Sequence, residues 1–254
     1  MARGPHITVR DLAVRYGDYV VMQDVSFTVR RGDVFVIMGG SGSGKSTLLN
    51  TMIGLVEPER GEVLYDDQSF THAAPQDRQA ISRRFGVLFQ FGALWSGLTL
   101  AENVALPLEE LTGLGRDEIR DLSEAKLALV GLGGFTEFYP NQLSGGMQKR
   151  AGLARAMALD PEILFFDEPS SGLDPVSARR LDDLIIELRD SLNTTIVVVS
   201  HDLASIFAIA NDAIYLDEQR KTATARGNPG DLLRHPPDRH VQAFLTRTAD
   251  EESS

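Results

Sequence analysis

A glycine- and serine-rich segment combines one lysine with several hydroxyl side chains, a combination suited to binding phosphate. The segment reads Gly39-Gly40-Ser41-Gly42-Ser43-Gly44-Lys45-Ser46-Thr47. Its glycines let backbone amides approach phosphate oxygens, and a helix that begins here adds a favourable dipole. Lys45 can supply a positive charge to the β- and γ-phosphates, and the Ser46 hydroxyl can coordinate Mg²⁺. Because an apolar run precedes the segment and a helical pattern follows it, G-x-x-x-x-G-K-[ST] predicts a nucleotide site.

Two adjacent carboxylates, Asp167 and Glu168, follow the apolar run at residues 163–166. Asp167 can reach Mg²⁺ directly or through water, and Glu168 can polarise a water for attack on the γ-phosphate. Taken alone, these side chains could equally be solvated acids at the end of a strand. Together with the segment at 39–47 they predict a catalytic site, since strands of one parallel sheet bring their carboxyl ends to a common edge.

The apolar pattern indicates an α/β fold. Continuous apolar runs at 34–38, 163–166 and 195–199 are typical of strands buried on both faces, and helical patterns lie between them. This alternation predicts a parallel sheet covered by helices. Residues 7–16 and 25–30 alternate instead, which predicts half-exposed antiparallel strands near the N-terminus. Residues from about 98 to 160 are mostly helical and are interpreted as an insertion between core strands.

Composition excludes several other classes of protein. The 254 residues carry a formal charge of −11, which argues against a nucleic-acid-binding surface. There is no cysteine, so disulfides and thiolate metal sites are excluded, and we expect a cytosolic chain. No apolar run approaches the roughly 20 residues that span a bilayer, and residues 1–6 do not resemble a signal peptide. We expect disorder only at the acidic tail, residues 250–252.

A third motif, Leu143-Ser144-Gly145-Gly146-Met147-Gln148, precedes the strand at residue 163 by about twenty residues. The chain resembles the ATP-binding cassette (ABC) ATPases, whose signature is L-S-G-G-x-Q at this place. The resemblance covers residues 7–226 and implies one ABC domain over 1–254, with an N-terminal antiparallel β subdomain and a RecA-like parallel-sheet core. The expected core is 7–90 and 161–226, the inserted helical subdomain is about 91–160, and the C-terminal tail is 227–254.

The signature also implies a homodimer. Ser144, Gly145 and Gly146 form a second small anion site at a helix N-terminus, followed by Gln148. One γ-phosphate cannot use two distant sites on one chain. The resemblance implies that two cassettes pair head to tail, so that the signature of one closes on ATP held by the other.

The remaining family motifs also have counterparts here. Gln90 matches the Q-loop glutamine, which contacts Mg²⁺ or water, and Asp174 belongs to a D-loop, Ser171-Gly172-Leu173-Asp174, that crosses the dimer interface. His201 matches the switch histidine that touches the γ-phosphate. Tyr16 matches the aromatic residue that stacks on adenine, although an exposed turn aromatic is the alternative. The implied cofactors are ATP and Mg²⁺, with Ser46, Gln90 and Asp167 as the metal ligands.

The stretch after Gln90 is where this family meets its membrane permease, and Phe91, Leu94 and Trp95 are candidates for the contact. Trp95 could instead be a core residue. The amino-acid sequence of residues 91–108 and of the tail resembles that of the ATPases that drive MCE-protein lipid transporters, the Mla-type phospholipid systems. That branch implies a peripheral ATP hydrolase at the cytoplasmic face of the inner membrane, with an MCE protein and a small regulatory subunit as further partners. We do not expect the longer C-terminal extension that is found in some Mla ATPases.

Two other functions remain open. The first is an ATPase for a binding-protein-dependent importer of polar solutes such as amino acids. The second is a soluble ABC ATPase without a transport role, which a single cassette with a charge of −11 disfavours. The neighbouring genes would discriminate between the first alternative and lipid transport.

Overall fold

The computed structural model describes residues 5–90 and 92–248, so Phe91 and the acidic residues 250–252 lie outside the described part. An antiparallel sheet has the strand order β2-β1-β4-β5. Its strands are β1 (Pro5–Tyr16), β2 (Tyr19–Arg30), β4 (Arg60–Tyr65) and β5 (Gln68–Ser69). The turn at Gly17-Asp18 joins β1 to β2. The antiparallel subdomain that the alternating pattern predicts is thus confirmed, and β4 and β5 extend it.

The second sheet has the strand order β10-β9-β3-β8-β7-β6. Its strands are β3 (Val34–Gly39), β6 (Phe85–Leu88), β7 (Ile163–Asp167), β8 (Thr195–Val199), β9 (Asp212–Asp217) and β10 (Thr222–Gly227). Neighbours from β9 to β6 pair in parallel, whereas β10 pairs with β9 antiparallel. The parallel α/β core is confirmed, and the antiparallel edge strand is an addition that the apolar runs did not indicate.

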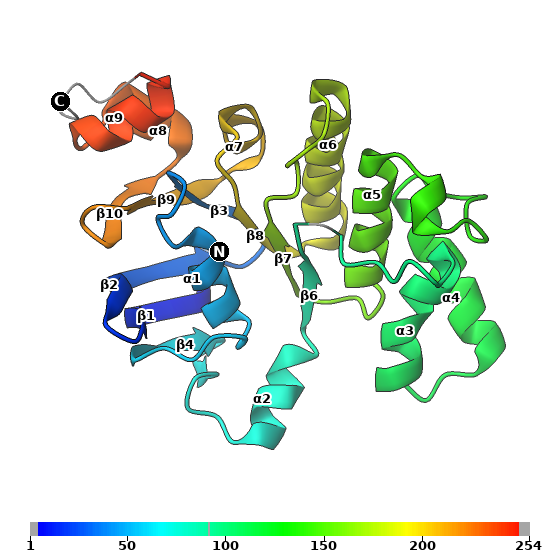
Figure 1. Cartoon of the computed structure of the whole chain (residues 1–254). Coiled ribbons are helices and arrows are strands. Elements are labelled where there is room, and N and C mark those ends of the chain that lie inside the picture. Colours follow the sequence, from blue (N-terminus) through cyan, green and yellow to red (C-terminus); the bar gives the residue numbers. More distant parts are fainter. Residues whose placement is uncertain (1–4, 91, 249–254) are drawn as a thin grey trace.

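Helices cover this sheet and form a separate group at one side of it, on the right of Figure 1. The helices are α1 (Lys45–Met52), α2 (Pro75–Ser82), α3 (Leu100–Leu111), α4 (Arg116–Leu129), α5 (Gly145–Ala156), α6 (Pro175–Leu192), α7 (Leu203–Ile209), α8 (Pro229–Arg234) and α9 (Arg239–Thr246), with a 3₁₀ turn at η1 (Pro140–Gln142). α3, η1, α4 and α5 all lie between β6 and β7, as the predicted helical insertion does. None of the helices in the described ranges has the length and hydrophobicity to cross a bilayer.

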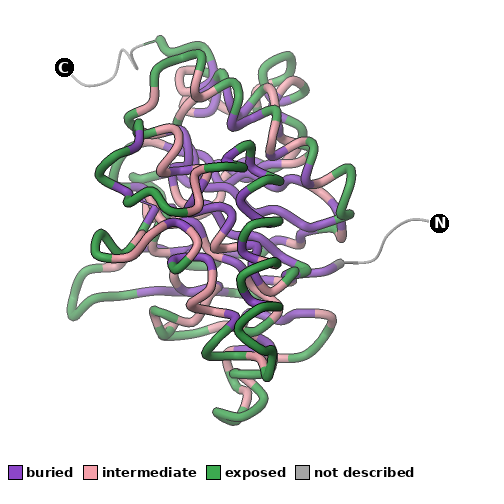
Figure 2. Tube along the Cα trace, turned by 90° about the vertical axis from the view of Figure 1, so that its right-hand side faces the viewer, coloured by how far each residue is buried: buried purple, intermediate pink, exposed green. Residues whose placement is uncertain are grey.

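Two apolar cores lie on opposite faces of the parallel sheet. Along β3, Val34, Val36 and Met38 belong to the core shared with the helical group, while Phe35 and Ile37 belong to the core shared with α1 and the antiparallel sheet. Alternate residues of a strand point to opposite faces, so a continuous apolar run is required here. Figure 2 shows the buried residues running through the middle of the molecule, with exposed residues around them.

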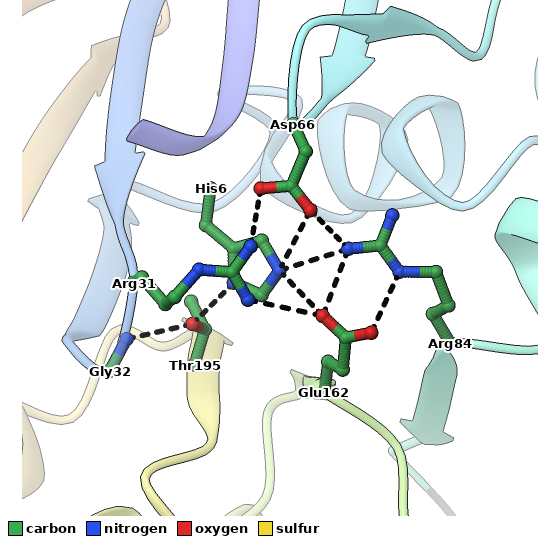
Figure 3. Close-up of polar contacts among 7 residues, drawn as sticks. All are labelled: His6, Arg31, Gly32, Asp66, Arg84, Glu162 and Thr195. Atoms are coloured by element: carbon green, nitrogen blue, oxygen red, sulfur yellow. Dashed lines mark hydrogen bonds and ion pairs between the residues drawn. The ribbon is translucent and has the colours of Figure 1, made fainter. Parts of the chain in front are cut away.

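A network of charged side chains joins the two sheets at the edge where β6, β7 and β8 begin (Figure 3). Its members are His6, Arg31, Asp66, Arg84 and Glu162. Arg84 donates to Asp66 and, over 2.9 Å, to Glu162, and Arg31 donates to the same two carboxylates. Hydrogen bonding by Arg84 holds the pKa of Glu162 below its ordinary value. His6, Asp66 and Glu162 are metal-ligand types close together, but two guanidinium groups already occupy their oxygens, which makes the cluster a structural ion-pair network.

Candidate nucleotide site

The glycine-rich loop runs from the end of β3 to the start of α1, in the strand–loop–helix order that the sequence predicts. Gly39 has a φ of 153°, and a Cβ atom there would lie 2.5 Å from the carbonyl oxygen of Leu216. Gly44 caps α1 in the left-handed region at φ 91°. Both positions therefore require glycine. The result is a tight loop whose amides precede a helix N-terminus, the geometry that binds anions.

Lys45 is held across this loop. Its Nζ atom donates to the carbonyl oxygens of Gly39 and Gly40 over 3.1 and 2.7 Å. Burial lowers the pKa of Lys45, and the carboxylates of Glu168 and Asp167 act in the opposite direction. The ammonium group thus lies between the loop and the carboxylates at the end of β7, where a phosphate would need a positive charge.

The structure brings Ser46 and Asp167 together from positions 121 residues apart. The Ser46 hydroxyl donates to Oδ1 of Asp167 over 2.9 Å. Gln90 follows β6, the strand that pairs with β7, and lines the cleft described below together with Ser46. Its Nε2 donates to the hydroxyl of Ser171 over 3.4 Å. A hydroxyl, a carboxylate and an amide carbonyl are oxygen ligands of the kind that Mg²⁺ prefers. The predicted ligand set is therefore chemically suited to this metal.

Glu168 and His201 form a second pair at this edge. Nδ1 of His201 lies 2.7 Å from Oε1 of Glu168. The backbone N–H of Glu168 donates to the carbonyl of Val199 over 2.9 Å, which ties the residue to the end of β8. The Glu168 side chain is only 12% exposed, whereas that of His201 is 63% exposed. A buried carboxylate is thus oriented by an imidazole that faces the cleft.

These residues surround a cleft of about 1060 Å³. Its walls are formed by Tyr16, Tyr19, Val21, Gly39, Gly40, Ser41, Gly42, Gly44, Lys45, Ser46, Thr47, Gln90, Glu168, His201, Leu203, Ala243, Phe244, Arg247 and Thr248. Tyr16 is 55% exposed at one wall, where a ring could stack on a base. Ser43 is buried instead, and its hydroxyl donates to the carbonyl of Gly40 over 3.0 Å.

Several residues of this cleft were not among the predicted site residues. They are Tyr19, Val21, Leu203, Ala243, Phe244, Arg247 and Thr248. The last four come from α9 and the residues after it, and the ring of Phe244 packs 5.2 Å from that of Tyr215. The only signal for them in the sequence is the amphipathic pattern at 241–245, which indicates a buried helix face without saying what that helix covers.

The signature residues do not line this cleft. Ser144 caps α5 and accepts from the N–H of Met147 over 3.3 Å, with Gly145 and Gly146 opening the helix. Gln148 donates from Nε2 to the carbonyl of Leu143 over 3.2 Å. Asp174 caps α6, where hydrogen bonding with Ser177 lowers its pKa. The phosphate loop and the signature residues thus lie at separate places on the chain.

An apolar groove lies between α2, β6, α3 and the C-terminal end of α5. It has a volume of about 450 Å³, and Phe85, Trp95 and Leu111 are among its lining residues. Trp95 is 65% exposed, so the alternative that it is a core residue is wrong. Leu94 is partly buried against the helical core. Asn103 fixes this turn by accepting from the N–H of Trp95 over 2.7 Å and donating to its carbonyl over 3.0 Å.

Comparisons with known proteins agree with this geometry. Residues 22–171 match the ABC transporter family. The chain is 40% identical to the intermembrane phospholipid transport system ATP-binding protein MlaF of Haemophilus influenzae, over 96% of this chain and 91% of that protein. It is 39% identical to the Escherichia coli K12 protein of the same name, over 96% and 90%. The probable ribonucleotide transport ATP-binding protein mkl of Mycobacterium tuberculosis is 44% identical over 79% of this chain, which spans only 56% of that protein's length.

Solved structures show the same fold. The cbiO1 protein of Clostridium perfringens, part of the transporter complex cbiONQ, superposes with a TM-score of 0.83 at 26% identity, over 91% of both chains. The dimeric ATP-binding cassette MJ0796, bound to ADP and Pi, has a TM-score of 0.77 at 30% identity, over 87% of this chain and 98% of that one. By its sequence match, its fold and the geometry of its phosphate loop, the chain belongs to the ABC transporter family of ATP-binding proteins.

Proposed function

We propose that this chain hydrolyses ATP to power a membrane permease that moves phospholipid, as a subunit of an Mla-type complex. One observation carries the choice of cargo. The similarity to proteins named for phospholipid transport extends over 96% of this chain and 91% of the relative. The similarity to the mycobacterial relatives is restricted to 56% of their length.

The site residues have distinct roles in this proposal. The loop at 39–47 and Lys45 bind the phosphates, and Tyr16 stacks on adenine. Ser46, Asp167 and Gln90 would hold Mg²⁺, which would neutralise charge on the phosphates. Glu168 accepts the proton of the attacking water as general base. His201, 2.7 Å from that carboxylate, orients it and reaches the γ-phosphate.

A homodimer completes the site. Ser144, Gly145 and Gly146 lie outside the cleft of their own chain, so they contact the γ-phosphate only when a second copy presents them. Gln148 supports the signature from within α5, and Asp174 approaches the interface between copies. The dimeric state of the structurally similar cassette MJ0796 supports this arrangement.

The permease is the partner proposed for the groove beside Trp95. A tryptophan with 65% of its surface exposed, next to an apolar groove, is typical of a site that receives a helix of another protein. Phe91 and Leu94 are proposed to contribute to the same contact. The chain then lies peripherally at the cytoplasmic face of the inner membrane, with an MCE protein and a small regulatory subunit as further partners. Its charge of −11 does not favour nucleic acid.

A polar cargo is the second candidate, because the mycobacterial relatives are named for ribonucleotide transport. To separate the two, we would reconstitute the chain with its co-purified permease in phospholipid vesicles. ATP-dependent movement of a labelled phospholipid supports the proposal. Movement of labelled ribonucleotide without phospholipid movement would favour the second candidate, and ATP hydrolysis by a chain that co-purifies with no permease would contradict both.

The groove is tested in the same preparation. Trp95→Ala should abolish stimulation of ATP hydrolysis by the permease while the isolated chain keeps its basal rate. Leu129→Ala removes a comparably exposed apolar side chain, 53% exposed, on α4 and serves as the control. Unchanged stimulation of the Trp95→Ala complex would show that the permease binds elsewhere.

A further inference from the structure

Two cations of the signature helix hold the backbone of the loop that follows Gln90. Lys149 donates from Nζ to the carbonyl oxygen of Gln90. One turn and a half further along α5, Arg155 donates to the carbonyl of Ala93 and, over 3.5 Å, to that of Gly92. The chain thus offers carbonyl oxygens from three positions of one short loop to side chains of a single helix.

Lys149 is an unusual residue for such a role, because it is only 7% exposed. Burial lowers its pKa, and the carboxylates of Asp167 and Glu168 oppose the shift. Desolvating a lysine costs free energy that a partner must offset. The other buried lysine of the helical group, Lys126, is 6% exposed and pairs with Asp160. Lys149 instead directs its ammonium group at a main-chain carbonyl beside the site.

The loop and α5 also touch directly. A Cβ atom on Gly152 would lie 2.9 Å from the carbonyl oxygen of Gly92. Gly92 and Ala93 both adopt positive φ angles, 72° and 51°, so the loop makes a sharp turn at the point of contact. A side chain at residue 152 would push the loop away from the helix. The close approach therefore leaves the loop little freedom to move without α5.

We propose that Lys149 is a positioning residue for Gln90, and that Lys149 and Arg155 together fix the backbone of Gln90, Gly92 and Ala93 to the signature helix. The inference deepens the proposed function and rests on the role assigned there to Gln90. Arg155 also lines the groove beside Trp95, so a helix seated there would act on the same contact.

The test compares Lys149→Met with Lys149→Arg in the permease complex and in the isolated chain. Methionine suits the buried site but cannot donate, so kcat should fall about 10- to 100-fold, as expected for a misplaced catalytic group. KM for ATP should stay within about threefold, since the phosphate loop is untouched, and more Mg²⁺ should be needed for half-maximal turnover. Lys149→Arg keeps a donor and should restore most of kcat.

Two controls separate positioning from stability. Lys126→Met removes the other buried lysine, and its kcat should remain near that of the original chain. Thermal unfolding of each variant identifies a loss of fold. If Lys149→Met is unstable, Lys149→Gln repeats the test with a polar side chain too short to reach the carbonyl. Normal turnover of a folded Lys149→Met or Lys149→Gln would overturn the proposal.

A double variant shows whether Lys149 acts through Gln90. The pair Lys149→Met and Gln90→Ala should be no slower than Gln90→Ala alone, because a positioning contact has nothing left to position. Multiplying effects would overturn the proposal while leaving the role of Gln90 intact. Normal turnover and normal Mg²⁺ dependence in Gln90→Ala would overturn both the positioning role and the assignment of Gln90 in the proposed function.

Discussion

Glu168 has a left-handed backbone conformation, with φ at 48°, directly after β7. Non-glycine residues adopt this conformation at a cost, and such residues concentrate at functional sites. Here the turn directs the carboxylate to His201, while the preceding Asp167 contacts Ser46. Adjacent acids therefore have different partners, which is consistent with different roles in hydrolysis.

Glu168→Gln should lower kcat by about 10²- to 10⁴-fold, because an amide keeps the shape of the side chain but cannot accept a proton. ATP affinity should change by less than about threefold, since the phosphate loop and Lys45 remain. Steady-state hydrolysis and equilibrium nucleotide binding measure the two quantities. Glu187→Gln, an exposed change on α6, is the control. Hydrolysis near the original rate would show that Glu168 is not the base.

Asp182 illustrates a buried acid outside the cleft. It is 5% exposed on α6 and accepts from the hydroxyl of Ser205 over 3.0 Å. Burial raises the pKa of Asp182 from 3.8 to about 6, and the charge of Asp202 makes a smaller contribution in the same direction. The hydrogen bond from Ser205 acts in the opposite direction. A raised acid pKa means that the folded protein holds this proton more tightly than the unfolded chain. The proton on Asp182 therefore stabilises the folded state at low pH, and this stabilisation is lost as the pH rises through about 6.

Asp182→Asn should raise the free energy of unfolding at pH 8 by about 1–3 kcal/mol, because the amide stays neutral and can still accept from Ser205. The gain should shrink as the pH falls through 6 towards the ordinary pKa of 3.8. Urea unfolding at a series of pH values measures it. Asp183→Asn changes an adjacent carboxylate that is 58% exposed and should show no such pH dependence. A pH-independent difference for Asp182→Asn would contradict the sign.

At the scale of elements, one edge of the parallel sheet carries the residues of the cleft, and the opposite edge contacts the charged network. The end of β3 and the residues just beyond β8 place Gly39 and His201 at the cleft, and the end of β7 places Asp167 in contact with Ser46, which lines it. The starts of β6, β7 and β8 instead meet the network of His6, Arg84 and their partners. Open α/β sheets bind ligands at the carboxyl ends of their strands. The network at the opposite edge joins the antiparallel sheet to the core.

Arg84→Ala should destabilise the fold by about 1–3 kcal/mol, because it leaves Asp66 and Glu162 without one of their guanidinium partners beside a buried His6. Arg84 is 22% exposed, and its loss is compared with that of Arg10, which is 53% exposed and pairs with Glu62. Arg10→Ala should cost less than about 0.5 kcal/mol, as exposed ion pairs do. Equal effects on chemical unfolding would show that the network contributes nothing beyond a surface ion pair.

At the scale of the whole molecule, a single chain holds the phosphate loop and the signature in different places. The phosphate loop, His201 and α9 line the cleft, whereas Ser144 lies outside it at the start of α5 in the helical group. In the proposed function, hydrolysis by this chain therefore requires a second copy that presents its signature residues. ATP affinity and turnover should therefore respond separately to changes at the signature.

Ser144→Arg should abolish hydrolysis while the isolated chain still binds ATP within about threefold, because the signature acts only on nucleotide held by a partner. In a Glu168→Gln background it should also prevent the ATP-induced dimer, as measured by light scattering. Mixing Ser144→Arg chains with Lys45→Ala chains should restore part of the activity, because one of the two composite sites is then intact. No recovery in the mixed dimer would contradict the head-to-tail arrangement.

Local patterns were sufficient to predict the phosphate loop, the buried strands and the acids at 167 and 168. Each depends on a few neighbouring residues: glycine where φ is positive, apolar side chains on both faces of a strand, and charge at the strand end. The resemblance to ABC ATPases added the order of the remaining motifs. The fold class follows from the same patterns, since alternating buried strands and helices pack in few ways.

Contacts between distant segments could not be predicted in this way. Three features depend on how elements pack against each other. They are the cleft wall formed by Phe244 and Arg247, the exposure of Trp95, and the hydrogen bond from Lys149 to the carbonyl of Gln90. A pattern shows that a helix face is apolar, or that a lysine interrupts it, without showing what lies opposite. Only the three-dimensional arrangement identifies that neighbour, because burial and pairing are properties of two surfaces and a sequence pattern describes one.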